Sequence, residues 1–322
     1  MTNRLVAMST LSLETMRAFL GRSIASGNAN KLRGLLAEIE LRNYLGSLGF
    51  TQRISPGGWI ARCDGQNTFG HHTVVMFPEL IEPDIPYPIG RNLSNPHGLH
   101  TICSTFHQSR IRAYFCAPTV STANDALSIE WQCVQLGLPF QQDYDSFPIS
   151  IDGFRQRPRR HNFLRYSTDA SLSPEAAVPE EFTKEHLRVA FQSMYFSELS
   201  PLHGLFWGNR FTCPLEISEQ PSANDRHLGT YFELDIGSFV KFAVITPERR
   251  NLNALFIVRE IDSPDTRRLS AWWFMTFDRL ARFAPSVPRG RRDGRGKSGA
   301  HTVIKIPQVE FEPLSMLALS TL

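Results

Sequence analysis

The sequence predicts an α/β protein with a mixed central sheet flanked by helices. Three observations favour this class. Stretches with the apolar spacing of helices alternate with short strand-like runs. The run Leu255–Val258 is apolar without interruption, as in a strand that is covered on both faces. The composition, 42% hydrophobic and 20% charged, supplies enough apolar material for a core.

Two helices are predicted at the start, over Leu11–Ala25 and about Asn30–Leu48, each followed closely by a glycine stop signal. A third is predicted over Asn124–Gly137, since Gly137 and Pro139 mark a helix end. Strands are expected between turn-rich segments, at Phe50–Ile54, Trp59–Cys63, Thr73–Phe77 and Ile111–Ala117.

Residues 151–181 form the clearest predicted boundary. They hold an arginine cluster followed by a Ser/Pro/Ala/Glu-rich run, a composition that buries little surface. We therefore expect an α/β domain of unknown role at residues 1–150, a basic and Ser/Pro-rich linker at 151–181, and a second domain at 182–322.

The second domain is predicted to mix helices and strands. Helices are expected at Thr183–Leu199 and Ser270–Ala284, while Ile236–Ile245 fits a helix or a strand. Asp235 stands where an N-cap would precede that run. The predicted strands are Phe211–Ile217, Thr230–Leu234, Asn253–Ile261 and Thr302–Ile306.

Composition restricts the possible settings. The five cysteines form no CxxC pair, so buried free thiols are expected in place of a disulfide framework or a zinc site. Neither a signal peptide nor an apolar run of about 18 residues is visible, so we expect a cytoplasmic protein without a membrane span. The net charge of +3 does not by itself indicate nucleic acid.

The stretch Arg210–Glu219 carries the main chemical signal. Apolar and other residues alternate along it with the period of a strand, and one face presents Glu216 and Ser218. A rigid strand fixes the position of a carboxylate oxygen, which suits a metal site. A strand-end carboxylate that caps a turn or pairs with Arg210 would give the same pattern.

The order of helix, strand ending in Glu-x-x-Glu, loop, helix and buried strand over Phe182–Ile306 resembles the PD-(D/E)xK restriction-endonuclease-like superfamily. That resemblance implies Mg²⁺-dependent phosphodiester cleavage. Glu216 matches the acid of the E-x-K half-motif and Glu219 follows it. The resemblance also gives weight to Glu38 and Glu40 inside the second helix, because many nucleases carry such a glutamate before the first core strand. A solvated helix face would look the same.

Two positions depart from the family pattern. Ser218 stands where the family has its lysine, and Lys241 on the next apolar element is the candidate replacement. The segment Leu205–Arg210 offers no upstream acid, and Glu198 is the nearest one. The implied metal ligands are therefore Glu216 and Glu198, with Glu216, Glu219 and Lys241 as catalytic candidates.

Two arginine-rich segments predict contacts with nucleic acid, because guanidinium groups pair with phosphates and glycines let the backbone approach them. Solvated surface loops would have the same composition. The segments supply Arg157, Arg159 and Arg160, and then Arg289, Arg291, Arg292, Arg295 and Lys297.

Together these observations predict a DNA-binding, nuclease-like protein of a restriction or defence system, with Mg²⁺-dependent cleavage if the site is active. The alternative is an inactive pseudo-nuclease subunit that binds nucleic acid, RNA included, or a partner protein within a larger complex. A homodimer is also compatible with the sequence.

Overall fold

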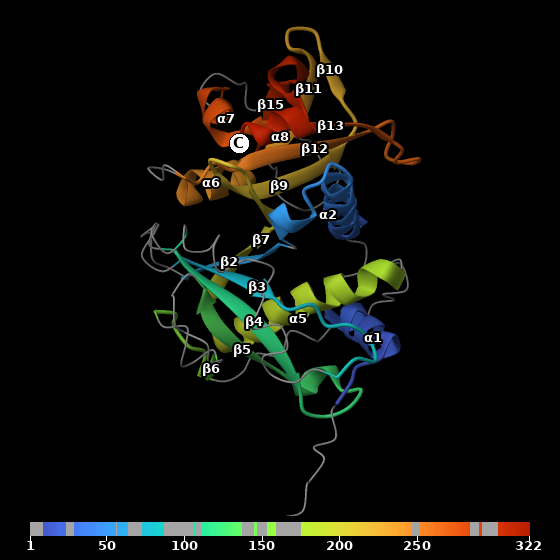
Figure 1. Cartoon of the computed structure of the whole chain (residues 1–322), viewed down its shortest axis with the longest axis vertical. Helices are drawn as coiled ribbons and strands as arrows, with labels where there is room; N and C mark the ends of the chain where they lie inside the picture. Colours follow the sequence, from blue (N-terminus) through green and yellow to red (C-terminus); the bar gives the residue numbers. More distant parts are fainter. Residues whose placement is uncertain are drawn as a thin grey trace, which may run out of the picture. The chain divides into compact units, whose positions relative to one another are not determined.

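The computed structural model describes residues 9–23, 29–55, 57–63, 73–86, 106, 111–136, 145–146, 153–158, 175–246, 251–283, 290–291 and 302–322 (Figure 1). The chain is an α/β protein with two six-stranded mixed sheets. It divides into two compact units, unit 1 with residues 1–35 and 58–201 and unit 2 with residues 36–57 and 202–322. Each unit is described by itself.

This division differs from the predicted one. The helix expected to open the second domain is α5 (Val178–Met194), and it packs in unit 1 against α1 (Leu13–Ser23). Residues 36–57, expected in the first domain, belong to unit 2. The arginine-rich composition of 151–181 therefore does not mark a boundary, because unit 1 is built from segments on both sides of it.

Unit 1 is a sheet in the order β6-β5-β4-β3-β2-β7, with α1 and α5 packed against it (Figure 1). The β3–β4 pair is parallel, and the β2–β3, β4–β5 and β5–β6 pairs are antiparallel. Phe19 of α1 and Phe182 of α5 pack edge to face within the core, with their ring centres 5.2 Å apart. The strands are β2 (Gly58–Cys63), β3 (Thr73–Pro78), β4 (Arg112–Val120), β5 (Ile129–Leu136), β6 (Asp145–Ser146) and β7 (Ser197–Leu202). Short 3₁₀ turns lie at Ala126–Ser128 and Glu175–Ala177.

The predicted helix at Asn124–Gly137 is wrong. Asp125 does cap a turn by accepting a hydrogen bond from the Leu127 N–H at 2.9 Å, but the turn is 3₁₀ and strand β5 follows. Ile129, Trp131 and Cys133 are buried while Glu130 is exposed, which is the two-residue period of a strand.

Unit 2 contains the second mixed sheet, in the order β1-β8-β9-β12-β13-β16. Only the central β9–β12 pair among these strands is parallel. A smaller antiparallel sheet has the order β10-β11-β15-β14. The strands are β1 (Ile54–Ser55), β8 (Gly204–Trp207), β9 (Thr212–Gln220), β10 (Ala223–Asp225), β11 (Gly229–Asp235), β12 (Leu255–Ile261), β13 (Leu269–Thr276), β14 (Gly290–Arg291), β15 (Thr302–Pro307) and β16 (Glu312–Pro313).

The six-stranded sheet of unit 2 is covered on both faces. Alternate residues point to opposite faces, so Leu215 and Ile257 pack against α2 while Phe256 packs against α6 and the smaller sheet. The helices are α2 (Ala29–Ser47), α6 (Ile236–Ile245), α7 (Phe277–Phe283) and α8 (Met316–Ser320), with 3₁₀ turns at Thr51–Arg53 and Gln308–Glu310. The uninterrupted apolar run in β12 follows from this double cover.

The helix predicted over Ser270–Ala284 is also a partial error. Strand β13 occupies Leu269–Thr276, and α7 begins at Phe277. Trp272 and Phe274 contact the α2 side, whereas Trp273 and Met275 contact the α6 side. Because both faces are apolar, the period of two is invisible in the sequence.

Unit 2 is discontinuous in sequence. The chain leaves it after Gly57 and returns at Leu202. These two points touch, since a Cβ atom on Gly57 would lie only 2.1 Å from the Leu202 carbonyl oxygen. The junction therefore requires a residue without a side chain. In the described parts of both units, no helix combines the length and the apolarity needed to cross a membrane.

Candidate functional site

Glu216 lies in the middle of β9 and faces α6. The helix begins where Asp235 accepts a hydrogen bond from the Gly237 N–H at 2.7 Å, so the predicted N-cap is confirmed. Ser238 and Lys241 are three residues apart on α6, a spacing that places two side chains on one helix face. The parallel strand β12 follows that helix along the chain.

Both carboxylate oxygens of Glu216 have partners on α6. The Ser238 hydroxyl donates to Oε1 and the Lys241 ammonium donates to Oε2. The structure thus brings Lys241, the candidate replacement for the family's lysine, to Glu216. Glu216 and Lys241 are each only 8% exposed. Arg210, the alternative partner, lies over its neighbour Phe211.

His203 extends this site, and sequence reasoning missed it. Its Nδ1 accepts a hydrogen bond from the Ile217 N–H at 2.9 Å, which fixes the ring against β9. Nδ1 also lies 3.4 Å from Glu216 Oε2, and Nε2 lies 3.9 Å from Glu38 Oε1.

The local backbone explains why the imidazole sits so close to the sheet. His203 immediately precedes Gly204, the first residue of β8. A Cβ atom on Gly204 would lie 3.1 Å from the Ser55 carbonyl oxygen and 3.2 Å from Cδ1 of Leu215.

Glu38 comes from α2 and is 7% exposed. Together Glu38, His203, Glu216, Ser238 and Lys241 form what we call the Glu216 cluster.

Charge keeps Glu216 ionised. Burial would raise its pKa, but the positive charge of Lys241, the nearby His203 and the hydrogen bonds from Lys241 and Ser238 outweigh burial and hold the pKa below its usual value. The cluster therefore contains a buried carboxylate whose charge is compensated mainly by one lysine.

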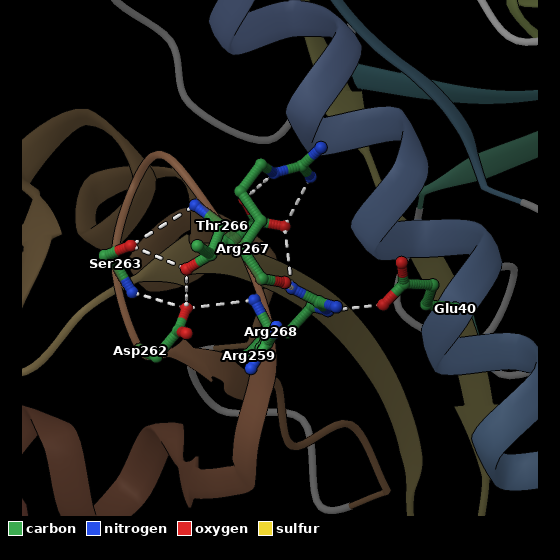
Figure 2. A network of polar contacts seen from close by, with 8 residues as sticks. Glu40, Arg259, Asp262, Ser263, Thr266, Arg267 and Arg268 are labelled. Carbon is green, nitrogen blue, oxygen red and sulfur yellow. Dashed lines mark hydrogen bonds and ion pairs between the residues drawn. The ribbon is translucent and has the colours of Figure 1, made fainter.

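Glu219, the other predicted catalytic glutamate, faces the opposite side of β9. It accepts two hydrogen bonds from Arg267, at 2.7 and 2.6 Å, and one from Arg259 Nη1 at 3.1 Å. Arg259 also reaches Glu40 on α2 (Figure 2). Because strand residues an odd number apart point to opposite faces, Glu219 cannot join Glu216 in one site.

The loop that carries Arg267 is held by Asp262 (Figure 2). Asp262 Oδ1 accepts hydrogen bonds from Thr266 Oγ1 at 2.6 Å, from the Ser263 N–H at 2.6 Å and from the Arg268 N–H at 3.0 Å. The bond from Thr266 is the main reason that the pKa of Asp262 lies below its usual value, although desolvation opposes it. Arg267 has a positive φ of 52°. The network of Glu40, Glu219, Arg259 and Arg267 is therefore a clamp that fixes this loop.

The expected Mg²⁺ site does not fit these residues. Glu198 lies in unit 1, where it forms an ion pair with Arg62. Both oxygens of Glu216 are taken by α6. In the described ranges, no three His, Cys, Asp or Glu side chains are arranged to hold a metal ion.

One of the predicted phosphate-binding arginines is well defined. Arg157 lies in unit 1 with its guanidinium carbon 4.2 Å from the ring centre of Phe196, and Arg155 lies 4.8 Å from the same ring. Arg157 Nε donates to the Tyr195 carbonyl oxygen at 3.1 Å. For Arg291, only its place in β14 opposite Thr302 is described. The remaining predicted basic residues lie outside the described residues, namely Arg159, Arg160, Arg289, Arg292, Arg295 and Lys297.

The free thiols predicted from the cysteine pattern are confirmed for Cys116, Cys133 and Cys213, which are buried. Burial raises the pKa of Cys213, and burial together with the neighbouring Cys133 raises that of Cys116. These thiols belong to the core and do not contribute to a site.

Comparison of the chain with protein-family models, with curated proteins and with solved structures gave no match.

Proposed function

We propose that this protein binds nucleic acid through Arg155 and Arg157, and that unit 2 is a restriction-endonuclease-like domain whose Glu216 cluster does not cleave. Such a protein would act as a pseudo-nuclease subunit in a restriction or defence system, with DNA as its principal ligand. The proposal rests on the arginine pair of unit 1, the layout of unit 2 and the occupied state of Glu216.

The arginine pair carries the binding part. Arg155 and Arg157 place two positive charges on the ring of Phe196. Each guanidinium gains a cation–π contact with this ring. A phosphate would pair with guanidinium groups of this kind through charge-assisted hydrogen bonds. Because the backbone hydrogen bond of Arg157 orients its guanidinium in advance, little side-chain entropy remains to be lost on binding.

The layout of unit 2 supports the nuclease-like part. A glutamate on β9 faces α6, and β9 pairs in parallel with the following strand β12. In this proposal Lys241 on α6, which donates to Glu216, takes the role of the lysine that Ser218 cannot fill. This arrangement is what the resemblance to the restriction-endonuclease-like superfamily implies for a relocated lysine.

Binding is tested by titrating labelled double-stranded DNA with the full chain at several salt concentrations. We expect the double variant Arg155→Ala, Arg157→Ala to lower affinity about tenfold or more. The slope of log K against log salt should fall by roughly two, since each phosphate contact contributes about one. The matched control is Arg279→Ala, because that arginine is already paired with Glu310 and Glu312. Unchanged affinity and slope in the double variant would remove this pair from the proposal.

Cleavage is the second candidate function, and the contact between Lys241 and Glu216 favours it. Supercoiled plasmid and single-stranded RNA are incubated with pure protein and Mg²⁺ or Mn²⁺. We expect both to remain intact. Nicking that disappears in Glu216→Gln but persists in Glu312→Gln would establish an active nuclease and refute the inactive site.

A further inference from the structure

Two of the free thiols lie next to one another in the core of unit 1. Cys116 of β4 is directly opposite Cys133 of β5 in the antiparallel ladder that joins these strands. Side chains that are directly opposite in such a ladder lie on the same face of the sheet. Both cysteines are completely buried in the same hydrophobic cluster. The fold thus places two thiols from different strands side by side.

A backbone hydrogen bond shows which kind of cross-strand pair they form. The Cys116 carbonyl oxygen accepts from the Glu79 N–H at 2.8 Å, on the side of β4 that faces β3. The N–H and C=O groups of one strand residue point to the same side, so those of Cys116 point away from β5. Cys116 and Cys133 are therefore a non-hydrogen-bonded pair, in which Cα atoms are about 4.5 Å apart. A disulfide requires about 4.4 to 6.8 Å, so the register of β4 and β5 permits one.

The closed core protects this pair from reaction. Burial, and then the neighbouring Cys133, raise the pKa of Cys116. The thiol consequently stays protonated, and only the thiolate is a nucleophile. Oxidation of the pair thus requires the core of unit 1 to open transiently, by the local unfolding that native proteins undergo.

We propose that Cys116 and Cys133 are an oxidation site, at which a small disulfide such as oxidised glutathione converts the two thiols into a cross-strand disulfide when the core of unit 1 opens. One cysteine thiolate attacks the oxidant, whose S–S bond breaks and releases one thiol. The second thiolate attacks the resulting mixed disulfide, so that the Cys116–Cys133 bond forms and the second thiol leaves. The cysteines lose two electrons and two protons, which the oxidant carries away as two thiols. The new bond ties β4 to β5 and holds this core closed.

The test uses the full chain and contains neither nucleic acid nor metal, so it can fail independently of the proposed function. Reduced protein is incubated with oxidised glutathione in urea concentrations below its unfolding transition, and the remaining thiols are then alkylated. Trypsin releases the peptide Ala113–Arg155, which contains Cys116 and Cys133 as its only cysteines. We expect this peptide to become two hydrogens lighter and resistant to alkylation, at a rate that rises with urea. Linked protein should have a higher Tm than reduced protein, because the link constrains the unfolded chain.

Two variants identify the pair. Cys133→Ala should prevent formation of the lighter peptide and leave Cys116 with at most a mixed disulfide to glutathione. Cys213→Ala is the matched control, because this buried thiol of unit 2 lies opposite Phe206, and the variant should leave the link unchanged. The proposal is overturned if the wild-type peptide stays fully alkylated at every urea concentration. A linked protein with a lower Tm than the reduced protein would also overturn it, since the folded geometry would then not accommodate the bond.

Discussion

Glu216 and Glu219 lie three residues apart on one strand, yet they occupy opposite environments. Glu219 faces α2 and is held by two arginines, with Arg259 also bound to Glu40. Glu216 faces α6 and is held by one lysine and one hydroxyl. Both side chains are buried, at 3% and 10% exposure.

The difference lies in geometry more than in charge. The guanidinium of Arg267 offers a rigid pair of donors that matches the carboxylate of Glu219, so that side is locked. The ammonium of Lys241 is a point charge at the end of a flexible chain, so it matches the carboxylate of Glu216 less specifically. Two glutamates that are equivalent in the strand pattern therefore differ in role. Glu219 fixes a loop through two arginines, and Glu216 is bound to α6 through one lysine and one hydroxyl.

The largest expected effect is at the arginine clamp. Glu219→Ala leaves Arg259, whose side chain is only 6% exposed, without one of its carboxylate partners. We expect a loss of about 4 kcal/mol in the free energy of unfolding, measured by urea denaturation. Glu312→Ala is the control, since its side chain is 57% exposed, and it should cost less than about 1 kcal/mol. Equal losses of unfolding free energy in the two variants would show that the ion pairs of Glu219 do not stabilise the fold.

Removing the cation of the Glu216 cluster should have the next largest effect. Lys241→Met leaves a buried carboxylate uncompensated, and we expect a loss of about 3 kcal/mol. Glu216→Gln in the same chain should recover part of it, because the neutral amide does not require a counter-charge. A double-mutant cycle by urea denaturation measures this coupling. Additive losses would contradict a direct Glu216–Lys241 interaction.

The pH dependence of stability is a smaller signature of the same site. The folded protein holds the pKa of Glu216 below its ordinary value of about 4.3. The resulting stabilisation is fully present above the unfolded pKa and is lost as pH falls through the folded pKa. The difference in unfolding free energy between wild type and Glu216→Gln should therefore shrink below about pH 4.3. If the difference grows on acidification, the pKa of Glu216 is raised in the folded state.

The smallest effect concerns the backbone of the clamp. Arg267→Ala and Arg267→Gly both remove the pair with Glu219, but only glycine adopts a φ of 52° without strain. We expect the glycine variant to be more stable than the alanine variant by about 1 kcal/mol. Equal unfolding free energies would indicate that the loop changes its conformation once the ion pair is lost.

Much of the element order follows from the sequence because local patterns agree with the fold. The helical spacing in α1 and α2 and the apolar runs in β3 and β12 are visible without a structure. At strand β13 the sequence predicts a helix because aromatic residues fill both faces of the strand. At strand β5 it also predicts a helix, because Asp125 and Gly137 resemble helix boundaries.

The site was only partly predictable for a different reason. Lys241 could be identified because the resemblance requires a lysine near Glu216. The mid-helix position of Glu38 was a visible signal, but His203 lies in the short segment between β7 and β8 and matches no motif. Only tertiary structure brings residues 38, 203 and 216 together. The alternation of side chains along a strand already predicts that Glu216 and Glu219 point to opposite faces. The resemblance to the restriction-endonuclease-like superfamily instead favours placing both in one site.

The discontinuity of unit 2 has a consequence for the order of folding during synthesis. Strands β1 and β8 are neighbours in one sheet, yet residues 58–201 separate them in the chain. Closing so long a loop is entropically costly while it is unfolded. Once unit 1 has folded, it acts as a short tether between Gly57 and Leu202, and the close contact of these residues completes the loop. The Glu216 cluster can therefore assemble only late, after the ribosome has released residues well beyond Leu202.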